Sequence, residues 1–268
     1  MPARFQLKDR HMPDAAPAKI AAAARLLEEA RRSGVQLAGL PADLAPADEA
    51  EAMAMHYAGV AAIGPIVGWK VGAPTPEAEP GQGALTASTL HDSPAALPAS
   101  TLKLWAVEAE IAVRLGRDLP ARETPYSREE VLAAVATWHP AIEVLDTAFE
   151  RWSEQPALWR MADRQSHGLL ILGPASTEPP PGPLDRAPVR LEIDGETVFE
   201  HEGGNTGGDP TRLLVALANR LREGPNHLKA ADVVTTGSAT PFRQAAAGET
   251  VTVAFEGLGS ATLTIGVD

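Results

Sequence analysis

The stretch LWAVEAEIAVRLG, residues 104–116, decides how this chain folds, because its side chains alternate in character with a period of two. One set of alternate residues is apolar and comprises Val107, Ala109, Ile111, Val113 and Leu115. The intervening set comprises Glu108, Glu110, Ala112 and Arg114. This alternation predicts a β-strand with its apolar face on a core.

Helical patterns lie upstream of this strand. Residues 15–32 (AAPAKIAAAARLLEEARR) are strong helix formers with a basic last turn before Gly34, and residues 47–62 give a second helix. The first strand-like segment, PIVGWKVG, covers residues 65–72. Residues 74–100 have no sustained period and are rich in Pro, Gly, Ser and Thr, so we expect a long loop of the kind that forms functional lids.

The second half of the chain is rich in strand and turn signals. SREEVLAAVATW, residues 127–138, begins with a capping-box spacing and predicts a helix that ends before His139-Pro140, and AIEVLD follows as a strand. Asp194-Gly195 predicts a hairpin. Asp209-Pro210 predicts the start of a helix that ends at Gly224.

Three strand-like segments, DVVTTG, ETVTVAF and SATLTIGV, close the chain, with the last turn at residues 256–259. Helices therefore come first and a β-rich part with two inserted helices follows. This order indicates an α+β fold built on a mixed sheet that folds on itself.

Length and composition limit the function classes. The chain has 268 residues, no cysteine and a formal net charge of −12. These values exclude thiolate and iron–sulfur chemistry and disfavour nucleic acid as a partner. The sequence shows no secretory signal and no membrane span, so we expect a cytoplasmic protein without a membrane partner. We divide it into a flexible arm (1–14), a helical part (15–66) and a β-rich catalytic core (67–268), which acts as a single functional unit.

Carboxylates of two strands form the candidate metal site. Glu108 and Glu110 leave the same face of their strand about 6.6 Å apart, and Glu143 stands between Ile142 and Val144 in the next strand. Three converging carboxylates would bind Mg²⁺ or Mn²⁺. The alternative is that Glu108 and Glu110 lie on the solvated face of an amphipathic strand.

Lys70, within GWKVG, has two interpretations as well. It could anchor a carboxylate or donate a proton beside a metal, or it could be an edge-strand lysine that blocks aggregation.

Residues 162–168 (ADRQSHG) lack the G-x-S-x-G elbow of a hydrolase and indicate a turn. EGGNTGG, residues 202–208, lacks the ending of a phosphate-binding loop, so we interpret it as a flexible loop that lines the site.

Several stretches together resemble the 2-keto-4-pentenoate hydratase and 4-oxalocrotonate decarboxylase group of the fumarylacetoacetate hydrolase superfamily. They are, in order, GWKVGA (68–73), VEAEIAVRLGRDLP (107–120), PAIEVLD (140–146), ADRQSHGLLILG (162–173) and ANRLREGPNHLKAADVVTTGSATP (218–241), followed by GETVTVAFEGLGSATL. The resemblance spans roughly residues 15 to 266 and follows the family's order. It implies a mixed β-roll of the fumarylacetoacetate hydrolase C-terminal-domain type, with the N-terminal helices packed on it.

The resemblance also implies the site. By position, Glu108, Glu110 and Glu143 match the metal carboxylates, and Lys70 and Ser166 match catalytic positions. The implied substrate-binding residues are Leu85, Ser88, Asp163, His167 and Ser238. The implied activity is that of a metal-dependent hydro-lyase in aromatic compound catabolism, acting on small 2-oxo or 2-hydroxydienoic acids with Mg²⁺ or Mn²⁺. Decarboxylation of a 2-oxo diacid, hydrolysis of a C–C bond and metal or ligand binding without turnover remain alternatives, and we expect a homo-oligomer.

The chain departs from the family pattern in the lid. Relatives carry an aspartate there in a stretch such as G-x-L-x-D-D-M, whereas GALTASTL (83–90) has Ala87 and Ser88. Asp92 could take its place if the loop is shifted. ADRQSHG replaces a version with smaller residues and puts Arg164 and His167 near the site.

Overall fold

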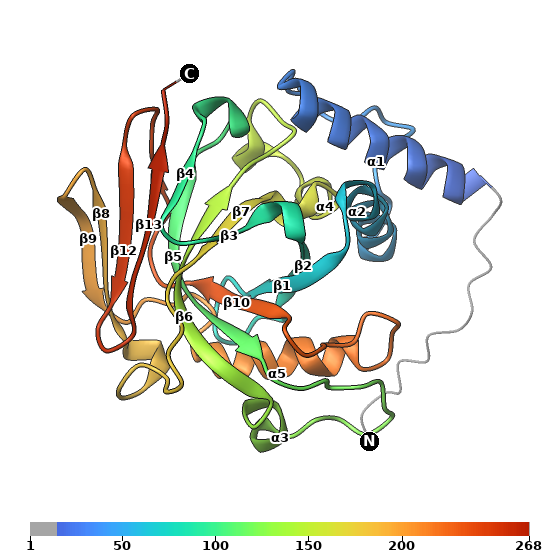
Figure 1. The fold of residues 1–268 in the computed structure, drawn as a ribbon. Coiled ribbons are helices and arrows are strands. Elements are labelled where there is room, and N and C mark those ends of the chain that lie inside the picture. Colours follow the sequence, from blue (N-terminus) through green and yellow to red (C-terminus); the bar gives the residue numbers. More distant parts are fainter. Residues whose placement is uncertain (1–14, 268) are drawn as a thin grey trace.

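The computed structural model describes residues 15–267, so the predicted arm at residues 1–14 lies outside the described residues. Two mixed sheets form the body, one of eight strands in the order β2-β1-β10-β5-β6-β7-β3 with β11 paired to β5, and one of five in the order β4-β13-β12-β8-β9. The five-stranded sheet lies on one side of the molecule, and α1 and α2 lie on the other (Figure 1). The predicted α+β class with a mixed sheet is confirmed.

The helices are α1 (Ala15–Ser33), α2 (Glu49–Ile63), α3 (Arg128–Leu132), α4 (Ala157–Ala162) and α5 (Pro210–Leu221). The strands of the larger sheet are β1 (Ile66–Gly72), β2 (Gly81–Thr86), β3 (Leu90–Asp92), β5 (Ala106–Leu115), β6 (Val135–Leu145), β7 (His167–Leu172), β10 (Val233–Ser238) and β11 (Arg243–Gln244). Those of the smaller sheet are β4 (Ala95–Leu97), β8 (Pro188–Ile193), β9 (Glu196–Glu202), β12 (Thr250–Phe255) and β13 (Gly259–Ile265).

The central strand β5 confirms the strand prediction for residues 104–116. Its apolar residues, among them Val107 and Ile111, enter a core shared with strands of the smaller sheet. The other face is largely covered, because Glu110 is only 2% exposed and Ala112 is fully buried. The alternative of a solvated carboxylate face is therefore wrong for Glu110.

The predicted long helices and the hairpin are confirmed. Helix α1 ends before Gly34, whose φ of +71° is the left-handed backbone that glycine favours at this position. Helix α2 is capped by Asp48, and α5 by Asp209 with Pro210 in its first turn. Between β8 and β9, Asp194 and Gly195 have φ angles of 51° and 80°, as a two-residue hairpin turn requires.

Two predictions were wrong. The helix predicted over residues 127–138 ends at Leu132, and residues from Val135 onward belong to β6. There Val113 of β5 stands opposite Trp138, so cross-strand pairing outweighs the local helix propensity. The loop predicted over residues 74–100 contains β2, β3 and β4, and β2 pairs along the whole of β1 with Gly83 opposite Lys70.

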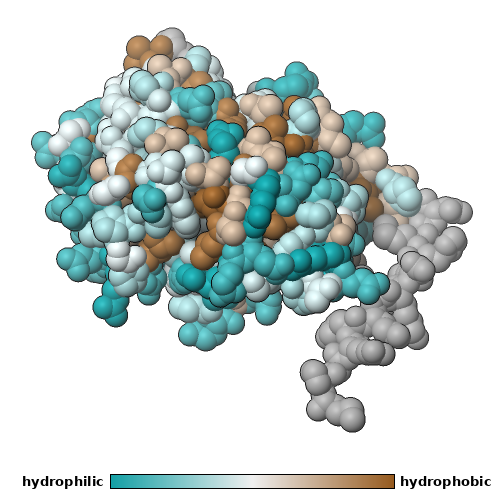
Figure 2. Space-filling model, turned by 60° about the horizontal axis from the view of Figure 1, so that its bottom comes forward, coloured by the Kyte–Doolittle hydropathy of each residue, from teal (hydrophilic) through white to brown (hydrophobic). Residues whose placement is uncertain are grey.

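The surface is mixed. On the face in Figure 2, hydrophobic residues lie interspersed among hydrophilic ones. Across residues 15–267, no helix combines the length and the apolar character that crossing a bilayer requires.

Candidate active site

A pocket of about 410 Å³ opens where β1, β2, β5, β6 and β10 meet α4 and the turn that follows it. Its lining joins acidic, basic and amide side chains from distant parts of the sequence. The lining residues are Lys70, Val71, Gly72, Ala73, Pro74, Gly81, Glu108, Glu110, Glu143, Arg160, Gln165, Thr206, Gly237 and Ser238. The predicted metal carboxylates, Lys70 and Ser238 therefore share one pocket, and Thr206 places the EGGNTGG loop in its wall.

Strand register brings the three carboxylates together. Glu108 of β5 stands directly opposite Glu143 of β6 in an antiparallel pair, and Glu110 follows two residues along β5. Directly opposite residues have Cβ atoms about 4.5–5.5 Å apart, and alternate residues share a face. One oxygen from each carboxylate lies within 4.8 Å of the others.

These carboxylates are costly to keep charged without a cation. Burial raises the pKa of Glu108 to about 7, and the neighbouring Glu143 adds to the rise. Burial likewise raises the pKa of Glu110 well above its usual value, with further repulsion from Glu143 and Glu108, although the Thr235 hydroxyl and the Gly237 N–H donate to Glu110 Oε2. A site built only of oxygens, with excess negative charge, fits Mg²⁺ or Mn²⁺.

Lys70 is the main positive partner of the third carboxylate. Its Nζ lies 2.6 Å from Glu143 Oε1 and also donates to the Gln165 carbonyl at 3.2 Å. Burial alone would raise the pKa of Glu143 and lower that of Lys70, but their attraction outweighs it. The pKa of Glu143 is held at about 2, and that of Lys70 is raised. Strand β1 lies between β2 and β10, so the edge-strand alternative for Lys70 is wrong.

The turn between α4 and β7 forms one wall of the pocket. Arg164, Gln165 and Ser166 have φ angles of 51°, 54° and 59°, a left-handed run that is costly for residues with side chains. This backbone directs the Gln165 carbonyl at Lys70 and its side chain into the pocket. Ser166 is 6% exposed and lies beside the lining, and its carbonyl accepts from the Asp146 N–H.

His167, at the start of β7, is placed beside the metal carboxylates. Its Nδ1 lies 3.2 Å from Glu143 Oε1, and its Nε2 lies 3.0 Å from Thr89 Oγ1. Burial lowers the pKa of His167, so the ring is neutral near pH 7. Because a carboxylate only accepts, Nδ1 is the nitrogen that donates to Glu143.

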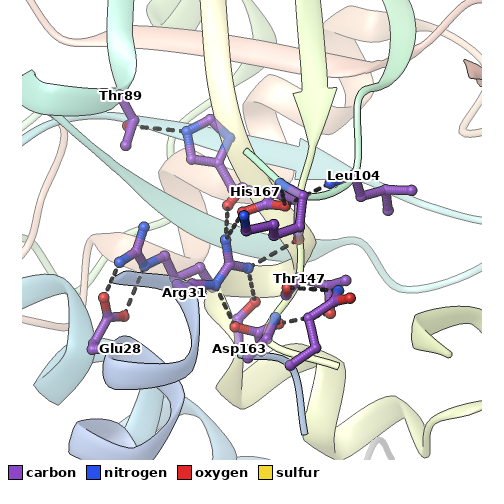
Figure 3. A network of polar contacts seen from close by, with 12 residues as sticks. Glu28, Arg31, Thr89, Leu104, Thr147, Asp163 and His167 are labelled. Carbon is purple, nitrogen blue, oxygen red and sulfur yellow. Dashed lines mark hydrogen bonds and ion pairs between the residues drawn. The ribbon is translucent and has the colours of Figure 1, made fainter. Parts of the chain in front are cut away.

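Asp163 is bound to helix α1 and does not line the pocket. Its Oδ1 accepts from Arg31 Nε at 2.5 Å, and its Oδ2 accepts from the Thr147 hydroxyl and the Ala148 N–H. Figure 3 shows Asp163 and His167 on either side of the Arg31 guanidinium, which also donates to the His167 carbonyl. Both carboxylate oxygens of Asp163 are thus occupied by the protein.

The lid segment contributes little to the lining. Leu85 is fully buried in an apolar cluster, and Ser88 is exposed in the single turn after β2, where its hydroxyl contacts Thr86. Asp92 is exposed in β3 beside Leu172, outside the lining residues, so it does not replace the family's lid aspartate here.

A larger cavity, of about 630 Å³, lies between α1, α2 and the start of β7. Its carboxylates are all paired with arginines, Asp146 with Arg31, Glu28 with Arg164 and Glu29 with Arg32. The three carboxylates that share a single lysine lie in the smaller pocket, which we therefore take as the reaction site. Sequence reasoning missed Arg160 and Gln165 in its lining. Arg160 belongs to no recognisable motif, whereas Gln165 lies in ADRQSHG, where the replacement of small residues was a signal for it.

Comparisons with known proteins identify the family of this chain. A family model described as fumarylacetoacetate (FAA) hydrolase C-terminal matches residues 69–266. The chain belongs to this family. A 2-keto-4-pentenoate hydratase of Paraburkholderia phymatum is 32% identical over 202 residues, which cover 73% of this chain and 76% of that protein. 2-Keto-4-pentenoate hydratase 2 of Dechloromonas aromatica is 30% identical and covers 89% of this chain and 94% of its own.

A solved structure shares the complete fold. The 4-oxalocrotonate decarboxylase from Pseudomonas putida G7, complexed with magnesium and adipate, has a TM-score of 0.82 at 24% identity and covers 96% of this chain and 100% of its own. The predicted family and the predicted type of fold, with N-terminal helices on a fumarylacetoacetate hydrolase body, are confirmed. The expectation of an enzyme is confirmed as well, because the curated relatives carry the names of hydratases and a decarboxylase.

Proposed function

We propose that the chain is a metal-dependent hydro-lyase of the 2-keto-4-pentenoate hydratase type, acting on small 2-oxo or 2-hydroxydienoic acids. This proposal rests mainly on one observation: the three glutamates lie close together in one pocket, and the buried Lys70 forms an ion pair with one of them. Relatives named 2-keto-4-pentenoate hydratase support the reaction type.

Glu108, Glu110 and Glu143 would hold the cation. When bound, Mg²⁺ or Mn²⁺ supplies a Lewis acid that stabilises the negative charge developing on a keto oxygen. The two carboxylates with raised pKa values would lose their protons on binding, and Glu143, whose pKa is already low, is ready to bind. The magnesium and manganese in related structures support this choice of ion.

Lys70 would act as the proton donor or as the anchor of the substrate carboxylate. Its raised pKa keeps Nζ protonated at neutral pH, so it cannot serve as the resting base. Glu143 and the Gln165 carbonyl fix the direction of its N–H bonds. Ser166 remains a proposed catalytic residue. The proposed substrate contacts from the resemblance remain Leu85, Ser88, Asp163, His167 and Ser238. Of these six residues only Ser238 lines the pocket.

Decarboxylation is the second candidate, because a 4-oxalocrotonate decarboxylase of Pseudomonas putida is 31% identical over 154 residues. C–C bond hydrolysis of an acylpyruvate is a further possibility within the family. The relatives named as enzymes speak against the non-enzymatic alternative, which is metal and ligand binding without turnover. We further propose a cytoplasmic homo-oligomer in aromatic compound catabolism, with residues 67–268 as the catalytic core and residues 15–66 as its helical part.

The test compares three substrates with Mg²⁺ present: 2-hydroxypenta-2,4-dienoate, oxaloacetate and an acylpyruvate. Loss of dienoate absorbance without release of carbon dioxide supports the hydratase. Tight metal binding with no turnover of any of the three would contradict an enzymatic role. Glu143→Gln should abolish both metal binding and turnover, and Glu196→Gln, which changes an exposed carboxylate of β9, serves as the matched control.

A further inference from the structure

His167 lies beside the metal carboxylates because strand β7 carries a bulge. Glu143 of β6 pairs with Leu170 of β7 in regular register. Two residues farther along β6, Leu145 pairs with His167, whereas regular register would give Gly168. One extra residue of this kind shifts the alternation of side chains by one position. The side chain of His167 therefore shares the face of the sheet that carries Glu143.

The buried ring of His167 is held at both nitrogens. The residue is 1% exposed, with Nδ1 3.2 Å from Glu143 Oε1 and Nε2 3.0 Å from Thr89 Oγ1 (Figure 3). A neutral imidazole carries one proton and a carboxylate only accepts, so Nδ1 donates to Glu143 and Nε2 accepts from the Thr89 hydroxyl. The His167 carbonyl accepts from Arg31 at 3.1 Å. These contacts fix the direction of the Nδ1–H bond.

Glu143 receives two donors on one oxygen. Lys70 Nζ lies 2.6 Å from Oε1, and His167 Nδ1 contacts the same atom. A carboxylate oxygen offers about two lone-pair sites, so these two donors occupy Oε1. Oε2 is then the oxygen left for a cation shared with Glu108 and Glu110, whose carboxylates lie within 4.8 Å of that of Glu143.

The two donors differ in how firmly they hold Oε1. The side chain of Lys70 is long and flexible, and in the proposed reaction its Nζ turns to the substrate. The imidazole of His167 is rigid and is bonded on its other side to Thr89. When Nζ moves away from Oε1, His167 is the donor that remains.

We propose that His167 is a positioning residue of the metal site, whose Nδ1–H holds Glu143 Oε1 so that Oε2 stays directed at the cation while Lys70 serves the substrate. This inference rests on the proposed function and deepens it by adding a group that acts through a metal ligand. It differs from the substrate contact that the resemblance implies for His167, which does not line the pocket. Thr89 extends the link to the single turn after β2, so the lid segment supports the metal site through the histidine.

The test compares Mn²⁺ affinities of the whole chain, measured by calorimetry, between variants that keep or lose the donor. His167→Leu fills a similar space without a donor, so the affinity should fall about ten- to a hundredfold, the range for partners of metal ligands. His167→Asn places its amide nitrogen at the position of Nδ1 and should restore most of the loss. Thr89→Val removes only the donor to Nε2, and we expect a smaller loss because Nδ1 keeps its bond.

His139→Leu is the matched control. His139 is buried like His167 and is also bonded at both nitrogens, but its partners are Thr137 Oγ1 and the Gly173 carbonyl. This variant should bind Mn²⁺ as the wild type does, even where its midpoint of thermal unfolding falls.

A second background separates the histidine from the lysine. In Lys70→Met, His167 is the donor left to Oε1. Adding His167→Leu to Lys70→Met should therefore lower the Mn²⁺ affinity by a larger factor than His167→Leu does alone.

Wild-type affinity in His167→Leu, or equal losses in His167→Leu and His167→Asn, would overturn the assignment. If His167→Leu does not fold, His167→Gln takes its place, because glutamine keeps a polar group near Thr89 and has none at the position of Nδ1. Failure of the wild type to bind Mn²⁺ would instead contradict the proposed function, and the inference with it.

Discussion

Replacing Arg31 by alanine should lower the free energy of unfolding by roughly 3–5 kcal/mol, because it leaves two buried carboxylates without their counter-charge. The Arg31 side chain is 5% exposed and lies 2.5 Å from Asp163 Oδ1 and 3.4 Å from Asp146 Oδ2. It also donates to the backbone carbonyls of His167, Asp146 and Asp163 at 3.1, 2.9 and 3.2 Å. These contacts attach helix α1 to the turn beside the pocket (Figure 3).

The adjacent residue provides the control. Arg32 is 74% exposed and pairs with Glu29 one turn earlier in the same helix, so Arg32→Ala should cost no more than about 1 kcal/mol. Both variants lose the same side chain from the same helix. Chemical denaturation measures the difference directly, and the midpoint of thermal unfolding should fall by about 6–20 °C for Arg31→Ala in a chain of this size.

A double variant tests the cause. Adding Asp163→Asn to Arg31→Ala removes one of the stranded charges, so the combined loss should be smaller than the sum of the single losses. Additive losses would show that the ion pair is not the source of the effect. Equal stability of Arg31→Ala and Arg32→Ala would refute the reasoning altogether.

The other predictions concern the metal pocket. Glu110→Gln should leave a folded protein whose Mn²⁺ affinity, measured by calorimetry, falls by more than about a hundredfold, since even outer partners of a metal site contribute ten- to a hundredfold; retained affinity would remove Glu110 from the ligands. Lys70→Met should lower turnover by about 10²–10⁴-fold while Mn²⁺ still binds, a range typical of positioned acids and bases, and wild-type turnover would exclude Lys70 from proton transfer. Because burial raises the pKa of Glu108 to about 7, protons compete with the cation below that pH, so the apparent Mn²⁺ affinity should fall as the pH drops from 8 to about 6. Calorimetry in buffers of different ionisation enthalpy should detect proton release at about pH 6.5, and a pH-independent affinity would contradict the assignment.

The parts of the fold with strong local signals could be predicted from the sequence. The alternation from Val107 to Leu115 predicted β5, and Asp194-Gly195 predicted the hairpin. Each of these patterns is local and is typical of one backbone conformation, so it needs no knowledge of distant contacts. β2 could not be predicted in this way. Its sequence GQGALT contains few β-branched residues, and its strand conformation depends on pairing with β1.

The site residues likewise divide into those that local sequence patterns predict and those that depend on distant contacts. Glu108, Glu110 and Glu143 could be proposed as neighbours because strand periodicity and the order of strands bring them together. The ion pair between Asp163 and Arg31 could not be predicted, because the two residues are 132 positions apart and meet only when α1 packs against the turn after α4. Arg160 was missed for a related reason: only the folded chain shows that its guanidinium lacks an acceptor.

The left-handed turn has a consequence for cooperativity. Asp163 and Arg164 are held by Arg31 and Glu28 of α1, whereas Gln165 and His167 contact Lys70 and Glu143. The run of positive φ angles persists only while both sets of contacts constrain it. Opening of α1 would release the backbone that aligns the lysine, so hydrogen exchange should show α1 and the pocket wall opening as one unit.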